Sequence, residues 1–251
     1  MKYKTKDLKA MARVQLSGRY GVYIGAYLLA AVIQFAISMI LSMVNSSSSL
    51  AAIFYSGNLF TSGNITRLIT YLLIEFIINL ILSVLMLGFN KMFLDGSRGY
   101  EVHFEDLFYG FRHHPDRVIL MQLLMGLINL VCILPGYILI ICALYFNAAL
   151  ILILSGSLLL IAGGILMIYF SLAFSQSMYL MADYDDLGPV QALKESQKMM
   201  SGNKLRYLYM ELSFIGFLLL GVLTCYIGFL WVMPYMSMTA TNFYRNIGGE
   251  I

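Results

Sequence analysis

The sequence predicts an all-α integral membrane protein, a bundle of about six transmembrane helices with amphipathic helices on the cytoplasmic surface. Of its 251 residues, 60% are hydrophobic and 12% are charged, whereas a soluble domain is about half apolar and a quarter charged. Apolar runs long enough to cross a bilayer as helices recur along the whole chain. No polar stretch is long enough for a separate soluble domain, so residues 1–251 are predicted to form one membrane domain.

The positions of the basic residues predict how the chain is oriented. Six of the 16 Lys and Arg residues precede the first apolar run, four lie in 91–117, four lie in 194–206, and Arg245 is near the end; only Arg67 lies elsewhere. Excess Lys and Arg marks cytoplasmic loops. We therefore expect these four regions and both termini in the cytoplasm. Such evenly spaced basic flanks also argue against nucleic-acid binding.

Residues 5–18 are predicted to form an amphipathic surface helix. Apolar residues, including Leu8 and Leu16, recur at helical spacing, and Lys9 and Arg13 lie elsewhere around the helix. We expect the apolar face to lie at the inner lipid surface, where each basic residue gains about 1 kcal/mol from anionic head groups. Lys9 and Arg13 are therefore candidate lipid head-group contacts.

The first membrane hairpin is predicted from two apolar runs, 20–44 and 68–90. The uncharged segment between them is rich in Ser, Gly and Asn, which suits an external loop. Glu75 and Asn79 lie four residues apart in the second run and so share one helical face. Because a charged side chain inside a bilayer costs at least about 2.5–3.5 kcal/mol, such residues usually face the bundle or a cavity. Both are candidates for binding a ligand or an ion.

The next cytoplasmic loop, 91–117, contains a second short amphipathic piece that ends before Pro115. The apolar sequence that follows, 118–181, is punctuated at Pro135-Gly136 and at 155–157. Cutting it at both places gives three helices. However, both ends of this run are flanked by basic residues and are therefore expected in the cytoplasm, which requires an even number of crossings. We therefore predict two crossings, the first broken at Pro135-Gly136 and partly re-entrant, the second over 157–181.

The break places Pro135 and Gly136 among the ligand or ion candidates. Irregular backbone at membrane depth is tolerated where it is buried in protein or faces a water-filled cavity. The alternative is a kink that serves only helix packing.

The last third is predicted to hold a third amphipathic run, from Pro189 to Lys204, and a hairpin of two spans, 205–222 and 227–244. Glu211 lies in the first of these spans and is a further ligand or ion candidate. The basic residues of the amphipathic run are candidate head-group contacts: Lys194, Lys198 and Lys204.

The chain also reads as three copies of one unit, 5–90, 103–182 and 186–246. Each unit opens with an Asp-Leu pair suited to cap a helix N-terminus, followed by an amphipathic run, a Gly and two apolar runs. The aspartates are Asp7, Asp106 and Asp186. The alternative is that any membrane protein carries basic linkers before its spans.

Several motifs resemble a known family. Ala192-Leu-Lys-Glu-Ser196, Met200-Ser-Gly-Asn-Lys204, Pro234-Tyr235 and Thr241-Asn-Phe-Tyr244 are similar to the domain of unknown function 975 family. The stretch 224–228 departs from it, standing where a Gly-rich turn is usual. The resemblance covers most of the chain and implies a multi-pass protein of a bacterial cell membrane, without an established role. More distantly, the chain resembles the membrane domain of some glycerophosphodiester phosphodiesterases, whose catalytic domain it lacks.

No catalytic or metal-binding pattern stands out in the sequence. The three cysteines form no CxxC pair, and the His, Asp and Glu residues of 103–116 match no HExxH or zinc-finger spacing. The sequence therefore predicts no enzyme activity, cofactor or metal.

Two functions remain open. The first is binding or transport of a small or lipidic ligand among the helices. The second is a membrane scaffold or modulator whose cytoplasmic amphipathic helices act on lipid head groups or a protein partner. Membrane lipids are the expected partners, and the sequence does not decide between a monomer and a homo-oligomer.

Overall fold

The computed structural model describes residues 3–44, 62–146 and 150–251, and in these residues all regular structure is helical. The predicted all-α membrane fold is confirmed. Five helical stretches are long and apolar enough to cross a membrane: Tyr20–Met39, Ile69–Ser97, Pro115–Ala143, Leu150–Asp183 and Lys204–Leu223.

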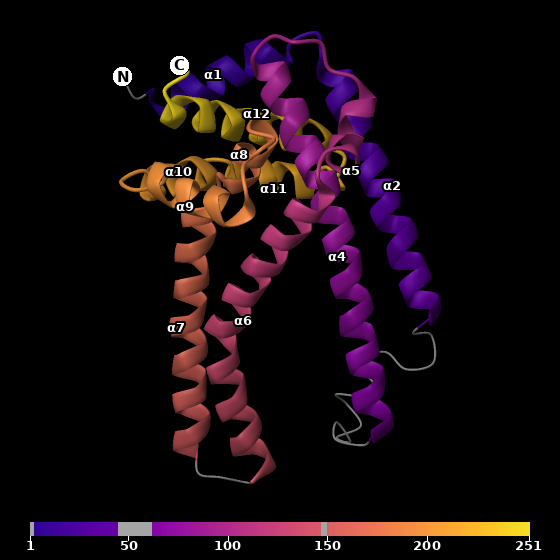
Figure 1. Cartoon of the computed structure of the whole chain (residues 1–251), viewed down its shortest axis with the longest axis vertical. Coiled ribbons are helices and arrows are strands. Elements are labelled where there is room, and N and C mark those ends of the chain that lie inside the picture. The colour runs from indigo at the N-terminus through magenta and orange to yellow at the C-terminus, as the bar shows by residue number, and fades with distance from the viewer. Residues whose placement is uncertain (1–2, 45–61, 147–149) are drawn as a thin grey trace.

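Four long helices run alongside one another and the remaining helices gather at one of their ends (Figure 1). The long helices are α2 (Tyr20–Val44), α4 (Ser62–Ser97), α6 (Pro115–Tyr145) and α7 (Leu150–Phe174). The short helices are α1 (Thr5–Leu16), η1 (Phe104–Phe108), α5 (Tyr109–Arg112), α8 (Ser177–Asp183), α9 (Pro189–Met199), α10 (Lys204–Leu212) and α11 (Ile215–Leu223). The last helix, α12 (Phe229–Gly248), belongs to the same end.

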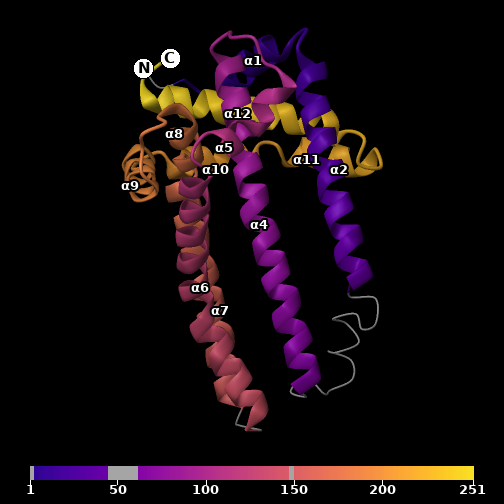
Figure 2. The ribbon, with the colours of Figure 1, turned by 45° about the vertical axis from the view of Figure 1, so that its right-hand side comes forward.

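Helices α1, α10, α11 and α12 lie across the ends of the long helices, and a view turned by 45° shows the same arrangement (Figure 2). We call these four helices the transverse layer. The two ends of the described chain both lie there, together with the start of α2, the end of α4 and the start of α6. The regions rich in Lys and Arg therefore share one end of the molecule, as the charge pattern predicts.

The predicted count of about six spans is approximate. The fifth predicted span corresponds to α10 and α11, and the sixth to α12, but all three lie across the long helices (Figure 2). The physical reason lies in α12, where Thr239, Thr241, Asn242 and Asn246 are buried among other protein groups. A helix that buries polar side chains in this way is held by protein contacts rather than by lipid.

The middle region makes two long helices, as predicted, but the break at Pro135-Gly136 is wrong. Pro135 lies inside α6, which continues for ten residues to Tyr145, and the sequence 155–157 lies inside α7. The helices are held together by close contacts at glycines. A Cβ on Gly136 would lie 2.7 Å from Leu160, and one on Gly163 would overlap the carbonyl oxygen of Cys132. Small residues that let two backbones approach are typical of membrane helix interfaces.

The cytoplasmic loop predicted over 91–117 is shorter in the structure. Helix α4 continues past Asn90 to Ser97, about two further turns. Pro115 is the first residue of α6, where its missing N–H costs nothing, and His114 before it has a left-handed backbone with φ of 49°. The longer α4 carries Arg98 into the transverse layer.

The apolar face of α1 does not lie in lipid, and that expectation is wrong. Leu8, Ala12 and Leu16 are fully buried in a core that also holds Tyr235 and Phe243 of α12. Each of the two buried leucines contributes about 1.5–3 kcal/mol. Helix α12 therefore takes the place that the sequence assigns to the membrane.

Two details match across the first two predicted repeat units. Asp7 accepts a hydrogen bond from the backbone N–H of Lys4 (3.1 Å), and Asp106 accepts one from His103 (2.7 Å). Each aspartate is thus the third residue of its helix rather than the capping residue before it. The three-unit division itself stays a prediction.

Candidate functional site

The ligand and ion candidates that the sequence places in the membrane spans do not form one site. Asn79 donates its side-chain amide to the backbone oxygen of Glu75 (2.8 Å), and Tyr71 hydrogen-bonds to the Glu75 side chain. These contacts all lie within α4. Gly136, on α6, instead packs closely against Leu160 of α7. The structure therefore explains Gly136 by helix packing and places Glu75 and Asn79 on another helix.

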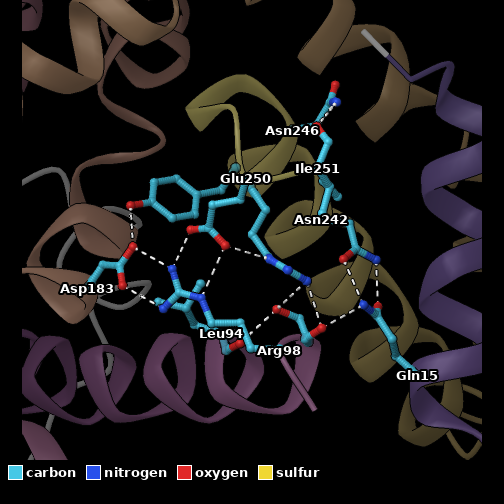
Figure 3. Close-up of polar contacts among 11 residues, drawn as sticks. Gln15, Leu94, Arg98, Asp183, Asn242, Asn246, Glu250 and Ile251 are labelled. Atoms are coloured by element: carbon cyan, nitrogen blue, oxygen red, sulfur yellow. Dashed lines mark hydrogen bonds and ion pairs between the residues drawn. The ribbon is translucent and has the colours of Figure 1, made fainter. Parts of the chain in front are cut away.

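A network of charged and amide side chains lies inside the transverse layer (Figure 3). At its centre, Arg98 forms two hydrogen bonds to Asp183 (2.6 and 2.8 Å) and also pairs with Glu250. Arg245 also donates to Glu250, to the oxygen Oε2 that accepts from Nε of Arg98 (2.9 and 3.2 Å). We call Arg98, Asp183, Arg245 and Glu250 the polar junction. It joins α4, α8, α12 and the segment after α12.

A second set of contacts extends the polar junction to α1. Ser97 O accepts hydrogen bonds from Arg245 (2.7 Å) and from Gln15 (2.9 Å). The side chains of Gln15 and Asn242 exchange two hydrogen bonds (3.2 and 2.7 Å) (Figure 3). Paired amides satisfy each other in this arrangement, which is how buried polar groups avoid an unpaired donor or acceptor.

Hydrogen bonds determine the charge state of the polar junction. Bonds to Asp183 and Glu250 raise the pKa of Arg98, so its guanidinium stays protonated. Burial raises the pKa of Glu250, but hydrogen bonds from Arg98 and Arg245 outweigh burial and place that pKa below its ordinary value. The polar junction is therefore a set of paired charges with a structural role in holding the layer together.

Sequence reasoning missed the residues of the polar junction. In the sequence, Asp183 is an acid that follows an apolar run, and Arg98 is one of four cations in 91–117. Their 85-residue separation gives no local spacing signal. The one available sign was that Arg245 is the only Lys or Arg after Arg206 in the sequence.

An open groove lies between the start of α1 and α10. Its volume is about 690 Å³, and it is lined by Tyr3, Lys4, Thr5, Lys6, Lys9, Arg13, Arg206, Tyr209 and Ser213. We call it the cationic groove, because five of these side chains are Lys or Arg and no lining residue is acidic. Two of the five, Lys9 and Arg13, are candidate head-group contacts from the sequence.

Two cations of the groove are held by neutral partners. Lys9 donates to Ser213 O (3.1 Å) and stands 3.8 Å from the centre of the Phe214 ring. Arg13 donates to the hydroxyl of Tyr235 (3.1 Å). Burial, followed by the nearby charge of Arg13, lowers the pKa of Lys9, although Glu211 acts in the opposite direction.

Arg206 connects the cationic groove to the interior. One of its Nη atoms donates to Asn246 (2.7 Å) and to the backbone oxygen of Tyr3. The other, Nη1, is buried and has no hydrogen-bond partner within the described chain. A buried donor without a partner is costly.

The other basic candidates lie away from the groove. Lys194 and Lys198 are exposed on α9, where Lys198 pairs with Glu195 (2.6 Å). Lys204 covers the ring of Tyr169 on α7, with its Nζ 3.7 Å from the ring centre. Of the five predicted head-group residues, the structure brings together only Lys9 and Arg13.

The chain matches the model of a known protein family. A family model described as "Protein of unknown function (DUF975)" matches residues 1–250. No curated protein and no solved structure matches the chain. The likeness to the membrane domain of glycerophosphodiester phosphodiesterases therefore stays a prediction.

Proposed function

The chain belongs to the DUF975 family of proteins of unknown function, and we propose that it is a non-enzymatic membrane protein that binds anionic lipid head groups in its cationic groove. The single observation that carries this proposal is the set of five cationic side chains around one opening: Lys4, Lys6, Lys9, Arg13 and Arg206. This proposal follows the scaffold or modulator alternative rather than ligand binding among the spans.

Unbalanced charge is the first argument. Like charges around one opening repel each other, and a ligand of opposite sign relieves that repulsion. The closest acid along α1, Asp7, accepts a hydrogen bond from the backbone of Lys4. In the described residues, the ion pairs of the chain include none of the five groove cations. A phosphate-bearing ligand would supply the missing negative charge.

Pre-positioned guanidinium groups are the second argument. Tyr235 holds Arg13 and Asn246 holds Arg206, and both partners come from α12. A guanidinium presents parallel N–H donors that match phosphate oxygens, and a side chain already fixed in place loses less entropy on binding.

The position of the groove is the third argument. It lies in the transverse layer, at the end of the long apolar helices (Figure 1). In a membrane this end would lie at the head-group level, where clustered Lys and Arg meet anionic lipid. We propose that this side is the cytoplasmic one, in a bacterial cell membrane.

The proposal is tested with the purified full chain in detergent. Binding of short-chain dioctanoyl phosphatidylglycerol and dioctanoyl phosphatidylcholine is compared by native mass spectrometry. We expect the anionic lipid to bind more tightly, and the Arg13→Gln, Arg206→Gln double variant to lose at least tenfold in affinity. The Lys194→Gln, Lys198→Gln variant is the matched control, because it removes two cations outside the groove. Equal binding of the two lipids, or an unchanged affinity of the Arg13→Gln, Arg206→Gln variant for the anionic lipid, refutes the proposal.

A further inference from the structure

A second pocket lies on the other side of α10 from the cationic groove. Its volume is about 450 Å³, and its walls come from α6, α7, α8 and α10. Its apolar lining includes Met121, Met125 and Met178. Its polar lining includes Gln122, Ser171, Ser175, Ser177, Tyr207 and Glu211.

Two of the polar groups have no partner in the part of the chain that the structure describes. These are the side-chain amide of Gln122 on α6 and the hydroxyl of Ser171 on α7. By contrast, Ser175 donates to Leu172 O (3.0 Å) and accepts from Gln176 (2.8 Å). Gln122 is half-buried and Ser171 is exposed, so both groups are accessible to a ligand or to water in the pocket.

Glu211 is the acid of the pocket and forms no ion pair within the described ranges. Its carboxylate accepts a hydrogen bond from Tyr207. The basic residues nearby are directed elsewhere: Lys9 stands over the Phe214 ring and Lys204 over the Tyr169 ring. A carboxylate in a partly apolar pocket attracts a cation strongly.

We propose that this pocket binds a protonated primary amine, with Glu211 as the counter-ion. The three ammonium protons have acceptors in the carboxylate of Glu211, the amide oxygen of Gln122 and the hydroxyl of Ser171. Methionine side chains adapt their shape to the methylene groups that follow the nitrogen. A multivalent metal ion fits less well, because in the described chain no group of three or more His, Cys, Asp or Glu gathers. The inference does not depend on the proposed function, since the cationic groove shares no lining residue with this pocket.

The amine has two sources that the same chemistry admits, a free amine and the head group of phosphatidylethanolamine. Equilibrium dialysis of radiolabelled ethanolamine against the purified chain tests the first. Native mass spectrometry of the chain released from nanodiscs of phosphatidylethanolamine or phosphatidylcholine tests the second. We expect saturable binding in at least one arm, weakened at least tenfold by Glu211→Gln. Glu195→Gln, which removes an exposed carboxylate of α9, is the matched control.

Either positive arm supports the proposal and identifies the source. No saturable binding in both arms overturns it, as does equal binding by wild type and Glu211→Gln. If Glu211→Gln is not monodisperse, the Gln122→Leu, Ser171→Ala double variant decides by the same tenfold criterion. Loss of phosphatidylglycerol binding does not bear on this test, since that lipid has no amine.

Discussion

Arg98, directly after α4, forms a two-point ion pair with Asp183, at the end of α8. The Nη1–Oδ1 distance is 2.6 Å and the Nη2–Oδ2 distance is 2.8 Å. This pair fixes the end of one long helix to the segment that continues from another. Paired planar groups of this kind combine attraction with a defined relative orientation.

Breaking this pair is predicted to destabilise the junction between the long helices and the transverse layer. Asp183→Asn keeps the shape of the side chain but removes its charge, and we expect a loss of about 1.5–3 kcal/mol in unfolding free energy. Lys91→Gln is the control, because it breaks an ion pair between Lys91 and Asp95 that lies within α4. Such a pair stabilises a helix by roughly 0.2–0.5 kcal/mol. Unfolding in mixed detergent micelles measures both. Equal effects would contradict a special role for Arg98 and Asp183.

The polar junction is also predicted to weaken in acid. The pKa of Glu250 is below its ordinary value when folded, because hydrogen bonds from Arg98 and Arg245 outweigh burial. Its stabilisation is therefore complete above the unfolded pKa of about 4.3 and is lost as pH falls through the lower folded value. The unfolding midpoint of wild type should drop toward that of Glu250→Gln below about pH 4. A constant difference between the two proteins from pH 7 to pH 3 would exclude this.

Two adjacent glycines of α7 should respond differently to the same change. A side chain on Gly163 would overlap the carbonyl oxygen of Cys132, whereas Gly164 has open space around its Cα. We expect Gly163→Val to cost about 1–3 kcal/mol by forcing α6 and α7 apart. Gly164→Val should cost little, apart from the propensity of valine in a helix. Thermal unfolding of the two variants checks this, and similar midpoints would mean that the hairpin is not packed as described.

Cysteine labelling distinguishes the transverse layer from a membrane hairpin. Cys225 is exposed and lies between α11 and α12, at the same end of the molecule as α9. On a background without Cys132 and Cys142, an impermeant maleimide should label Cys225 from the same side of the membrane as Lys198→Cys. A Tyr145→Cys reporter, placed on a background that also lacks Cys225, should react only from the other side. Labelling of Cys225 from the Tyr145 side would restore the six-span arrangement.

The sequence was sufficient where the signal is local. The spacing of Leu8 and Leu16 predicts α1, the positions of basic residues predict one charged end, and Pro115 predicts where the amphipathic piece before α6 ends. Each of these depends on residues within a few turns of each other. The parity of the basic flanks also predicts two crossings in 118–181, which is the number of long helices there.

The sequence was insufficient where protein replaces lipid as the environment. Pro135 reads as a break, but a proline inside a membrane helix is tolerated when neighbouring helices support the backbone. The runs after Lys204 read as spans because composition does not reveal that α12 packs on α1. The cationic groove and the pocket of Glu211 depend on the same contacts. Of the residues that line these two sites, the sequence predicts only Lys9, Arg13 and Glu211 as candidate site residues.

The length of α4 has a consequence for the lipid that surrounds the protein. At 36 residues and 1.5 Å per residue, the helix is roughly 54 Å long, whereas the hydrocarbon core is about 30 Å thick. The surplus must be absorbed by tilting or by turns that project beyond the acyl chains. A thicker bilayer would cover more of α4, and the surface of that bilayer would lie closer to Arg98. We therefore expect this protein to be sensitive to membrane thickness.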